Sequence, residues 1–422
     1  MILTIARKEI HENVVSFKFP VITLLVTLTL LASIFIMYRD YQLRMENYEI
    51  LRPSSNEPVA IVSPTPLSIF VKGLDETIGR SYRIQFGGQI QVGSNQQSVN
   101  TLFRLFTTPD LLYIVKVIMA LCAMLFAFDM ISGEKESRTL SLSLANHLKR
   151  TSIIIGKWIG GFISLMLPFL IALLIGTIVI SLSPLVQMSA EEWVKLGMFL
   201  CGSVLYLAFF FSLGLFISCV TQTAASSLVM SLFVWALVVF VLPNLGNTLA
   251  RQFVEIPSVQ QLEVKREHIW IKEVFEFGQK RKQGSVTETS VNDLLGAINS
   301  ENDKLIADYR IGFRGLVDLS KNITRLSPSA AFTFLSTELM GTGIEEEQKV
   351  KEAVLRYKDV VWNQPTDSGG NILGEFPAFS YERSSLSGAV SGEGFINIMI
   401  LVLFTVISFV AAYVAFLRYD VR

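Results

Sequence analysis

One charged segment of the chain, residues 131–157, carries residue types that suit contact with another protein. Its acids come first, at Glu134 and Glu136, and its later bases include Lys149 and Arg150. This order suits the dipole of a short helix, and carboxylates accept strong hydrogen bonds from a basic cleft. The alternative is a solvated helical connector between two membrane spans, and composition by itself leaves both open.

Motifs for chemistry within the chain itself are absent from the sequence. Gly156-Lys157 is followed by Trp158 and lacks the upstream glycine and the Ser/Thr of a phosphate-binding loop. His11-Glu12 has Val15 where a zinc-binding helix would place its second histidine. We therefore expect no enzyme active site and no cofactor in this chain, which disfavours a membrane-anchored enzyme.

The composition indicates what must position the charged segment. Of 422 residues, 51% are hydrophobic and 17% are charged, so a multi-span membrane protein is expected. The 36 basic and 36 acidic residues balance, which argues against a nucleic-acid partner.

Six nearly uncharged runs are long enough to cross the hydrocarbon core, which takes about 20 residues. They are expected at 20–38, 111–131, 153–181, 196–217, 225–243 and 395–417. Short segments at 1–19, 132–152 and 418–422 hold most of the adjacent Lys and Arg, so the positive-inside rule places them in the cytoplasm. We expect a multi-pass protein of the cell inner (cytoplasmic) membrane with both termini cytoplasmic and the first run retained as an anchor.

Two long loops then face outward. We expect residues 39–110 to form a small β-rich domain; the alternative is an irregular loop. The domain is indicated by short runs rich in β-forming residues, and the last two runs are joined by a hairpin signal at Gly87-Gly88: Val59–Val62, Leu67–Val71, Tyr82–Phe86 and Gln89–Val92. We expect residues 244–394 to form a larger helical domain, because two sets of apolar residues recur at helical spacing. The first set is Val291, Leu295, Ile298, Leu305, Tyr309 and Leu316, and the second is Val350, Val354, Tyr357 and Val361.

Two further helices are expected beside the membrane. The apolar stretch Ala330–Met340 either lies on the outer membrane surface or packs under other helices. The N-terminal 1–19 segment forms an amphipathic helix on the cytoplasmic leaflet. The expected fold is an α-helical polytopic membrane protein with six transmembrane helices, a small β-rich outer domain and a larger helical outer domain.

Short motifs in the charged segment resemble a known family. The run of Glu134, Glu136, Arg138, Thr139 and Leu140, then Lys149-Arg150 and Gly156-Lys157, is similar to the E-x-E-x-G-T-L … R … G-K run of ABC-2 type permeases. These permeases are related to nitrous-oxide-accessory and gliding-motility permeases. Arg138 stands where the family usually has glycine, and Asn146-His147 replaces a turn that usually contains proline.

The resemblance implies the following partners and site residues. Segment 132–152 supplies a coupling helix that docks on a separate ABC ATP-binding subunit, where ATP and Mg²⁺ are bound. The ATPase-docking residues are then Glu134, Glu136, Arg138, Thr139, Leu140, Lys149 and Arg150. A second permease subunit, identical or closely related, completes the membrane part.

The resemblance implies a transmembrane permease subunit of an ABC-type exporter, whose outer domains gate the exit or hand substrate to an accessory protein. A different class of function is a mechanical or signalling module, in which ATPase strokes reach the outer domains without solute transport. The substrate stays open, since an apolar bundle suits lipids, hydrophobic peptides and drugs alike.

Overall fold

The computed structural model describes residues 1–52, 57–84, 90–93, 109–141, 149–254, 256–282, 289–364 and 376–419. In these ranges, six helical stretches have the length and hydropathy of membrane spans: Lys18–Leu51, Leu111–Glu136, Arg150–Ser181, Ala190–Val220, Ala224–Phe253 and Glu393–Leu417. The chain divides into two compact units, one of Met1–Val239 with Pro328–Arg422 and one of Phe240–Ser327. The predicted helical polytopic fold is confirmed.

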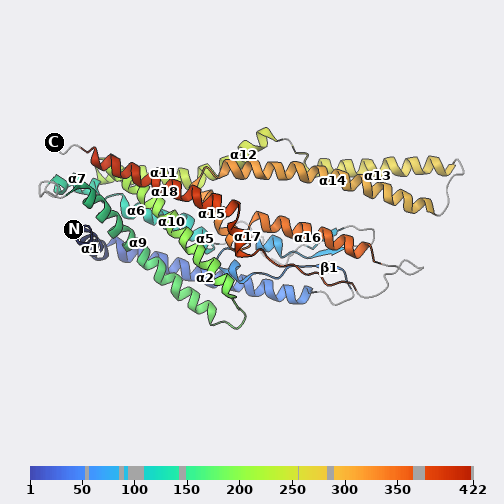
Figure 1. Ribbon diagram of the computed structural model, residues 1–422, viewed down its shortest axis with the longest axis horizontal. Coiled ribbons are helices and arrows are strands. Elements are labelled where there is room, and N and C mark those ends of the chain that lie inside the picture. The colour runs from blue at the N-terminus through green and yellow to red at the C-terminus, as the bar shows by residue number, and fades with distance from the viewer. Residues whose placement is uncertain are drawn as a thin grey trace. The chain divides into compact units, whose positions relative to one another are not determined.

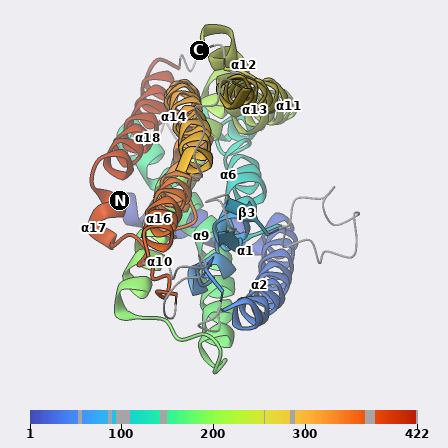
Figure 2. The ribbon, with the colours of Figure 1, turned by 90° about the vertical axis from the view of Figure 1, so that its right-hand side faces the viewer.

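The spans of the first unit pack around two long helices, α9 (Arg150–Ser181) and α10 (Ala190–Val220). α10 lies against α6 (Ala120–Ala127) and α18 (Glu393–Leu417), while α9 lies against α2 (Lys18–Leu51). Figure 2 shows α2 and α18 on opposite sides of this group. Figure 1 shows both termini at one end of the first unit, which we call the terminal end; the opposite end is the sheet end.

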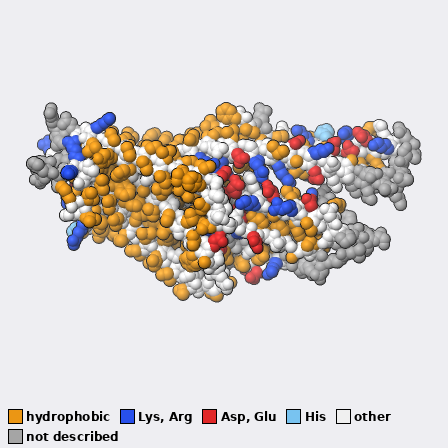
Figure 3. Space-filling view, in the orientation of Figure 1, with side chains coloured by type: hydrophobic (Ala, Val, Ile, Leu, Met, Phe, Trp, Pro, Cys, Tyr) orange, Lys and Arg blue, Asp and Glu red, His pale blue; other side chains and the backbone are white. Residues whose placement is uncertain are grey.

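The sequence of the spans explains where they begin and end. α10 ends at Val220 and α11 (Ala224–Ala236) begins within the polar stretch that was expected to separate them. α10 starts with a capping box between Ser189 and Glu192, which satisfies free backbone N–H groups. Hydrophobic side chains cover the spans on the face shown in Figure 3, and Lys and Arg side chains gather at the terminal end.

Small residues on α10 serve contacts within the chain. A Cβ added at Gly202 would lie 3.2 Å from Leu335, and one at Gly214 would lie 3.0 Å from the Cβ of Ala127. These glycines therefore let α15 (Pro328–Leu339) and α6 approach α10 closely.

Helix α2 is longer than the span predicted at 20–38. Its 34 residues extend about 51 Å at 1.5 Å per residue, whereas the hydrocarbon core is about 30 Å thick. Residues 39–51, predicted to belong to the β-rich domain, therefore continue the helix beyond the membrane. The span and the part of the chain beyond it are joined by an uninterrupted helix rather than by a loop.

The sheet end contains three antiparallel strands in the order β1-β2-β3: β1 (Val59–Ala60), β2 (Tyr82–Ile84) and β3 (Ile90–Val92). Ile84 pairs with Ile90, which is the pairing expected of the predicted hairpin, although Gly87-Gly88 lies outside the described residues. The strand expected at Leu67–Val71 is wrong: this stretch forms η1 (Pro66–Ile69), a short 3-10 helix, because Thr65 caps it and Pro66 fixes its first turn.

Helix α16 (Ile344–Trp362) belongs to the same core as the sheet. Its predicted stripe is confirmed, since Val350, Val354, Tyr357 and Val361 are all buried. These side chains pack against Ala60, Val62, Ile78, Tyr82 and Ile84. The two loops that sequence separated into two outer domains thus share one hydrophobic core.

The apolar stretch at Ala330–Met340 packs under other helices, as one of the two alternatives expected. α15 lies against α10 and α18. Phe332 is fully buried and stacks on Tyr206, with ring centroids 4.5 Å apart. This helix is apolar because it belongs to the core of the bundle.

The second unit is helical. It contains α12 (Leu242–Phe253), α13 (Val259–Lys282) and α14 (Thr289–Thr324), with α14 packed against both others. The stripe predicted on α14 is confirmed at Ile298, which is buried, whereas the side chains of Val291 and Leu295 lie outside the described residues. α14 is 36 residues long, or about 54 Å.

Candidate coupling site

The N-terminal helix α1 (Ile2–Val15) packs directly on α9 at the terminal end. Gly156 and Gly160 of α9 make this contact close. A Cβ at Gly156 would lie 2.8 Å from the Cβ of Ile5, and one at Gly160 would lie 2.6 Å from the carbonyl oxygen of Ala6. The four-residue spacing of these glycines gives α9 a groove into which α1 fits.

A group of three charges, with Glu9 and Lys157 buried and Glu134 partly buried, joins α1, α9 and the charged segment. Lys157 Nζ lies 3.0 Å from Glu9 Oε2 and 3.0 Å from Glu134 Oε1. Burial raises the pKa of Glu9 above its ordinary value, while the attraction of Lys157 acts in the opposite direction. Because a buried cation needs charged partners, Lys157 fixes both carboxylates in place.

Two residues of α7 (Ser132–Glu136) bind the ends of neighbouring spans. Lys135 Nζ donates to the carbonyl of Thr221 at 3.0 Å and to that of Cys219, where α10 ends. Glu136 Oε2 accepts from the backbone N–H of Ala224 at 2.9 Å, where α11 begins. A cation at a helix C-terminus and an anion at an N-terminus are both favoured by the helix dipole.

Arg150 joins α9 to the last span. Its guanidinium donates to the carbonyl of Leu417, the last residue of α18, at 2.7 Å and to that of Tyr419, just beyond it, at 2.9 Å. Lys149 is the N-cap residue of α9 and is exposed. Of the two predicted bases, one therefore caps a helix within the chain and the other faces outward.

Arg138 adopts φ +59°, the left-handed conformation that favours glycine. The ABC-2 run that the sequence resembles usually has glycine at this position, and the backbone geometry explains why. The arginine side chain is exposed. The departure from the pattern therefore costs backbone strain and adds a positive charge to the surface.

Of the two remaining predicted site residues, one is exposed and the other is buried. Thr139 is exposed and its hydroxyl lies 2.9 Å from that of Ser137. Leu140 is buried. Residues 142–148, including most of the predicted coupling helix with its leucine stripe, lie outside the described residues.

The structure thus brings the seven predicted docking residues to one end of the bundle but separates them into two groups. Glu134, Leu140 and Arg150 contact the rest of the chain and are at least partly buried. Four others present exposed side chains, although that of Glu136 also binds the start of α11: Glu136, Arg138, Thr139 and Lys149.

Glu9 was not predicted from sequence to be a site residue. A signal was available, because Glu9 lies on the apolar side of an amphipathic helix, close in helical projection to Ala6. Asp129 also has a partner that sequence reasoning missed, since it forms an ion pair with Lys18.

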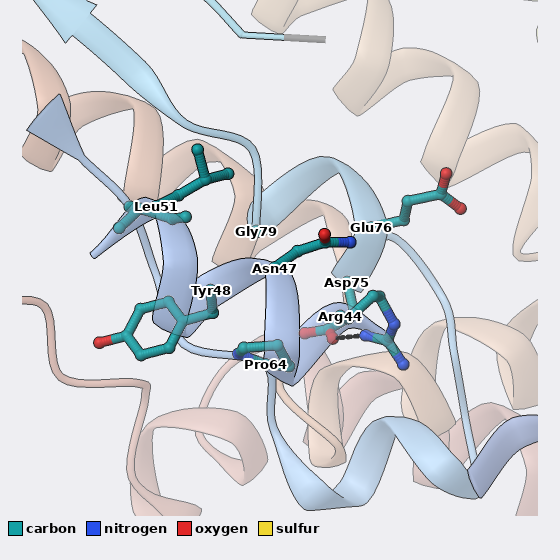
Figure 4. A pocket seen from close by; sticks show the side chains of 9 residues that line it. Arg44, Asn47, Tyr48, Leu51, Pro64, Asp75, Glu76 and Gly79 are labelled. Carbon is teal, nitrogen blue, oxygen red and sulfur yellow. Dashed lines mark hydrogen bonds and ion pairs between the residues drawn. The ribbon is translucent and has the colours of Figure 1, made fainter. Parts of the chain in front are cut away.

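A second charged cluster lies at the sheet end. Asp75 is buried and forms ion pairs with Arg44 of α2 and with Arg383, the latter at 2.7 Å. Arg383 also donates to the carbonyl of Gly341 at 2.6 Å. Figure 4 shows Arg44 and Asp75 beside a cavity of about 10 Å³, which has room for roughly one water molecule. The cluster therefore acts as a clamp between segments rather than as a substrate pocket.

The fold and this arrangement define a multi-pass integral membrane protein in which the charged segment between two spans is tied by ion pairs and hydrogen bonds to several other helices. A comparison with protein families matches residues 3–421 to the family described as ABC-2 family transporter protein. The chain belongs to this family, whose members are membrane transport subunits and are not themselves catalytic. No curated protein matches the chain.

Proposed function

We propose that this chain is the transmembrane subunit of an ABC exporter, driven by a separate ATP-binding subunit that docks on the 132–152 segment. Membership of the ABC-2 family supports a permease subunit of an ABC transporter. The observation that carries the coupling part of the proposal is the ion group of Glu9, Lys157 and Glu134. It fixes the docking segment to α9 and α1, so a force on the segment displaces helices rather than bending a loop.

The dock itself consists of the exposed residues of the segment. The side chains of Glu136, Arg138, Thr139 and Lys149 are exposed to an approaching ATPase, whereas Glu134 is largely covered and engaged with Lys157. Charge-assisted hydrogen bonds to the exposed groups would each contribute roughly 1.5–3 kcal/mol when buried by the partner. ATP and Mg²⁺ belong to the partner in this proposal, and a second permease subunit completes the membrane part.

Charge reversal tests the dock. Arg138→Glu together with Lys149→Glu should reduce recovery of the ATP-binding subunit on purification and reduce ATP-driven activity, because both side chains are exposed. Membrane insertion and the melting temperature of the isolated chain should stay unchanged. Lys351→Glu, exposed on α16, is the matched control. An unchanged yield of complex with the double variant would remove the electrostatic dock from this segment.

The sidedness is part of the proposal, with both termini in the cytoplasm of the inner membrane. Lysine and arginine at the terminal end support it. Glu49→Cys on the outer part of α2 should react with a membrane-impermeant maleimide in intact cells, and Ser137→Cys should react only after lysis. Reaction of Ser137→Cys in intact cells would reverse the topology.

A mechanical module is the second candidate, and the length of α2 favours it. This helix runs from the membrane into the sheet end, where Arg44 binds Asp75, so movement of the first span reaches the outer part directly. Reconstituted complex should separate the candidates. ATP-dependent uptake of labelled solute into inverted vesicles supports an exporter, whereas ATP-dependent distance changes at the sheet end without uptake support the mechanical module.

A further inference from the structure

The second unit contains a helix with apolar residues on two opposite faces. On α13, Leu262 and Ile269 are partly buried on the side that packs against α14. On the opposite side Val264, Ile271 and Phe275 are 51%, 54% and 66% exposed. A stripe of large apolar side chains on the surface marks a site of interaction.

The spacing of this stripe is that of a coiled-coil seam. Val264, His268, Ile271 and Phe275 follow one another at intervals of four, three and four residues. This alternation keeps side chains on one line of a helix and directs them at a second helix lying alongside. The seam is confined to α13, so its partner is another helix of similar length.

The charged residues beside the seam favour a second copy of α13 as the partner and a parallel orientation of the two helices. Glu267 precedes seam residue His268 on one flank, and Lys272 follows seam residue Ile271 on the other. In a parallel two-stranded coil, residues on opposite flanks that are five positions apart meet across the interface. Glu267 and Lys272 are five positions apart, so two copies of α13 would form the pair twice. Antiparallel pairing would bring residues of the same flank together, with like charges opposed.

We infer that α13 pairs with α13 of a second copy of this chain, in parallel and in register. The inference rests on the proposed function in one respect, that two membrane subunits hold their outer loops on the same side of the membrane. Four seam positions, fewer than two heptads, make a weak coiled coil in isolation. Anchoring both copies in one complex raises the effective concentration of the two helices and makes a weak seam sufficient.

Disulfide cross-linking in membranes tests the pairing. The single variants Val264→Cys, Ile271→Cys and Phe275→Cys should each give a dimer on a non-reducing gel after mild oxidation, because in-register pairing brings every seam residue to its own counterpart. The parent chain with its three cysteines measures background. Glu276→Cys is the matched control, since it is exposed on the same helix but lies away from the seam.

Each other outcome is decisive. Cross-linking at one seam position alone indicates antiparallel helices and overturns the parallel register. A dimer that forms only when a related permease is co-expressed overturns the second copy as the partner. Absence of cross-links in a purified complex shown to hold two copies overturns the inference and leaves the proposed function intact.

Charge exchange tests the register independently. In the Ile271→Cys background, Glu267→Lys or Lys272→Glu should lower the cross-linking yield roughly threefold, because repulsion replaces attraction in both symmetric pairs. The double exchange Glu267→Lys with Lys272→Glu should restore the yield, since it re-forms the pairs in reverse. Glu276→Lys should leave the yield unchanged. Failure of the double exchange to restore cross-linking counts against the parallel register.

Discussion

Lys157 binds two carboxylates that come from different elements, and at 6% exposure it is removed from water. Glu9 brings α1 to it and Glu134 brings α7. Three charges in a buried site are costly to assemble, but loss of one member costs more because it leaves the others unpaired. The group is therefore suited to holding three elements in one geometry.

Replacing the central cation should destabilise the chain strongly. We expect Lys157→Met to lower the free energy of unfolding by about 3–5 kcal/mol, because Glu9 and Glu134 lose their partner. The measurement is the thermal unfolding of the purified chain. A triple variant with Glu9→Leu, Glu134→Leu and Lys157→Met should recover most of the loss; if it is less stable than Lys157→Met, unpaired charge is not the cause.

The same variant should depend on pH in a defined direction. A carboxyl group with a raised pKa favours folding while it is protonated, and this contribution is lost as the pH rises through the raised pKa. Burial already raises the pKa of Glu9 from its ordinary value of 4.5. Without Lys157 the rise is larger, so the loss of stability in Lys157→Met should be smaller at about pH 5 than at about pH 8.

A change at Arg138 should stabilise the chain rather than destabilise it. Arg138→Gly should raise the free energy of unfolding of the isolated chain by about 1 kcal/mol, because glycine adopts φ +59° without the Cβ clash. Ser137→Gly is the control, since Ser137 has φ −79° and gains nothing. An equal rise in both variants would show that backbone strain at Arg138 is not relieved by the change.

Charged residues of the segment and of the start of α9 bind the ends of α10, α11 and α18. Lys135 binds carbonyls where α10 ends, Glu136 binds the first N–H of α11, and Arg150 binds carbonyls where α18 ends. Each contact places a charge where the helix dipole favours it. A displacement of the segment is thereby shared among several spans.

The contact between α1 and α9 can be broken at a single glycine. Gly160→Leu should release α1, because even a Cβ at this position would lie 2.6 Å from the backbone of Ala6. A released helix of 14 residues is marginally stable in water, so trypsin should cleave faster at Arg7 and Lys8. Gly197→Leu, at a position with no atom within 4 Å of an added Cβ, is the control. Equal cleavage rates in the two variants would show that this glycine does not hold α1.

At the scale of the whole molecule, ion pairs at the sheet end connect the first span with the segment that enters the last. Asp75 binds Arg44 from α2 and Arg383, and Lys195 of α10 donates to the carbonyl of Ser384 at 2.8 Å. Glu346 of α16 accepts from the hydroxyl of Ser384 at 2.6 Å. Three spans are thus bound to one polar layer above the membrane.

The clamp at Asp75 should contribute strongly to stability. Asp75→Asn should lower the free energy of unfolding by about 3–5 kcal/mol, because Arg383 loses its counter-charge and Arg44 keeps only Asp40. Glu76→Gln, at an exposed neighbour that pairs with Lys72, should cost less than about 1 kcal/mol. Thermal unfolding of both variants checks the difference. A loss at Asp75 no larger than at Glu76 would mean that the clamp is not a stabilising element.

Membrane-spanning helices, the paired strands and the helical stripes could be predicted from sequence because each leaves a local periodic pattern. Hydrocarbon requires long apolar helices, and the buried stripe of α16 repeats at helical spacing. The ends of elements were less predictable: α2 continues to Leu51 through residues whose polarity indicated a loop.

The charged segment was identified by its sequence, whereas the partners of its charges were decided by the tertiary structure. Glu134 and Glu136 look alike in sequence, yet one lies 3.0 Å from buried Lys157 and the other caps α11 at the surface. The stripe of α16 predicts burial in the same way, without indicating that strands nearly 300 residues earlier cover it. Local patterns record what each residue needs, such as an apolar neighbour or a counter-charge. Which segment supplies it depends on contacts between residues far apart in the chain, and those exist only once the helices have packed.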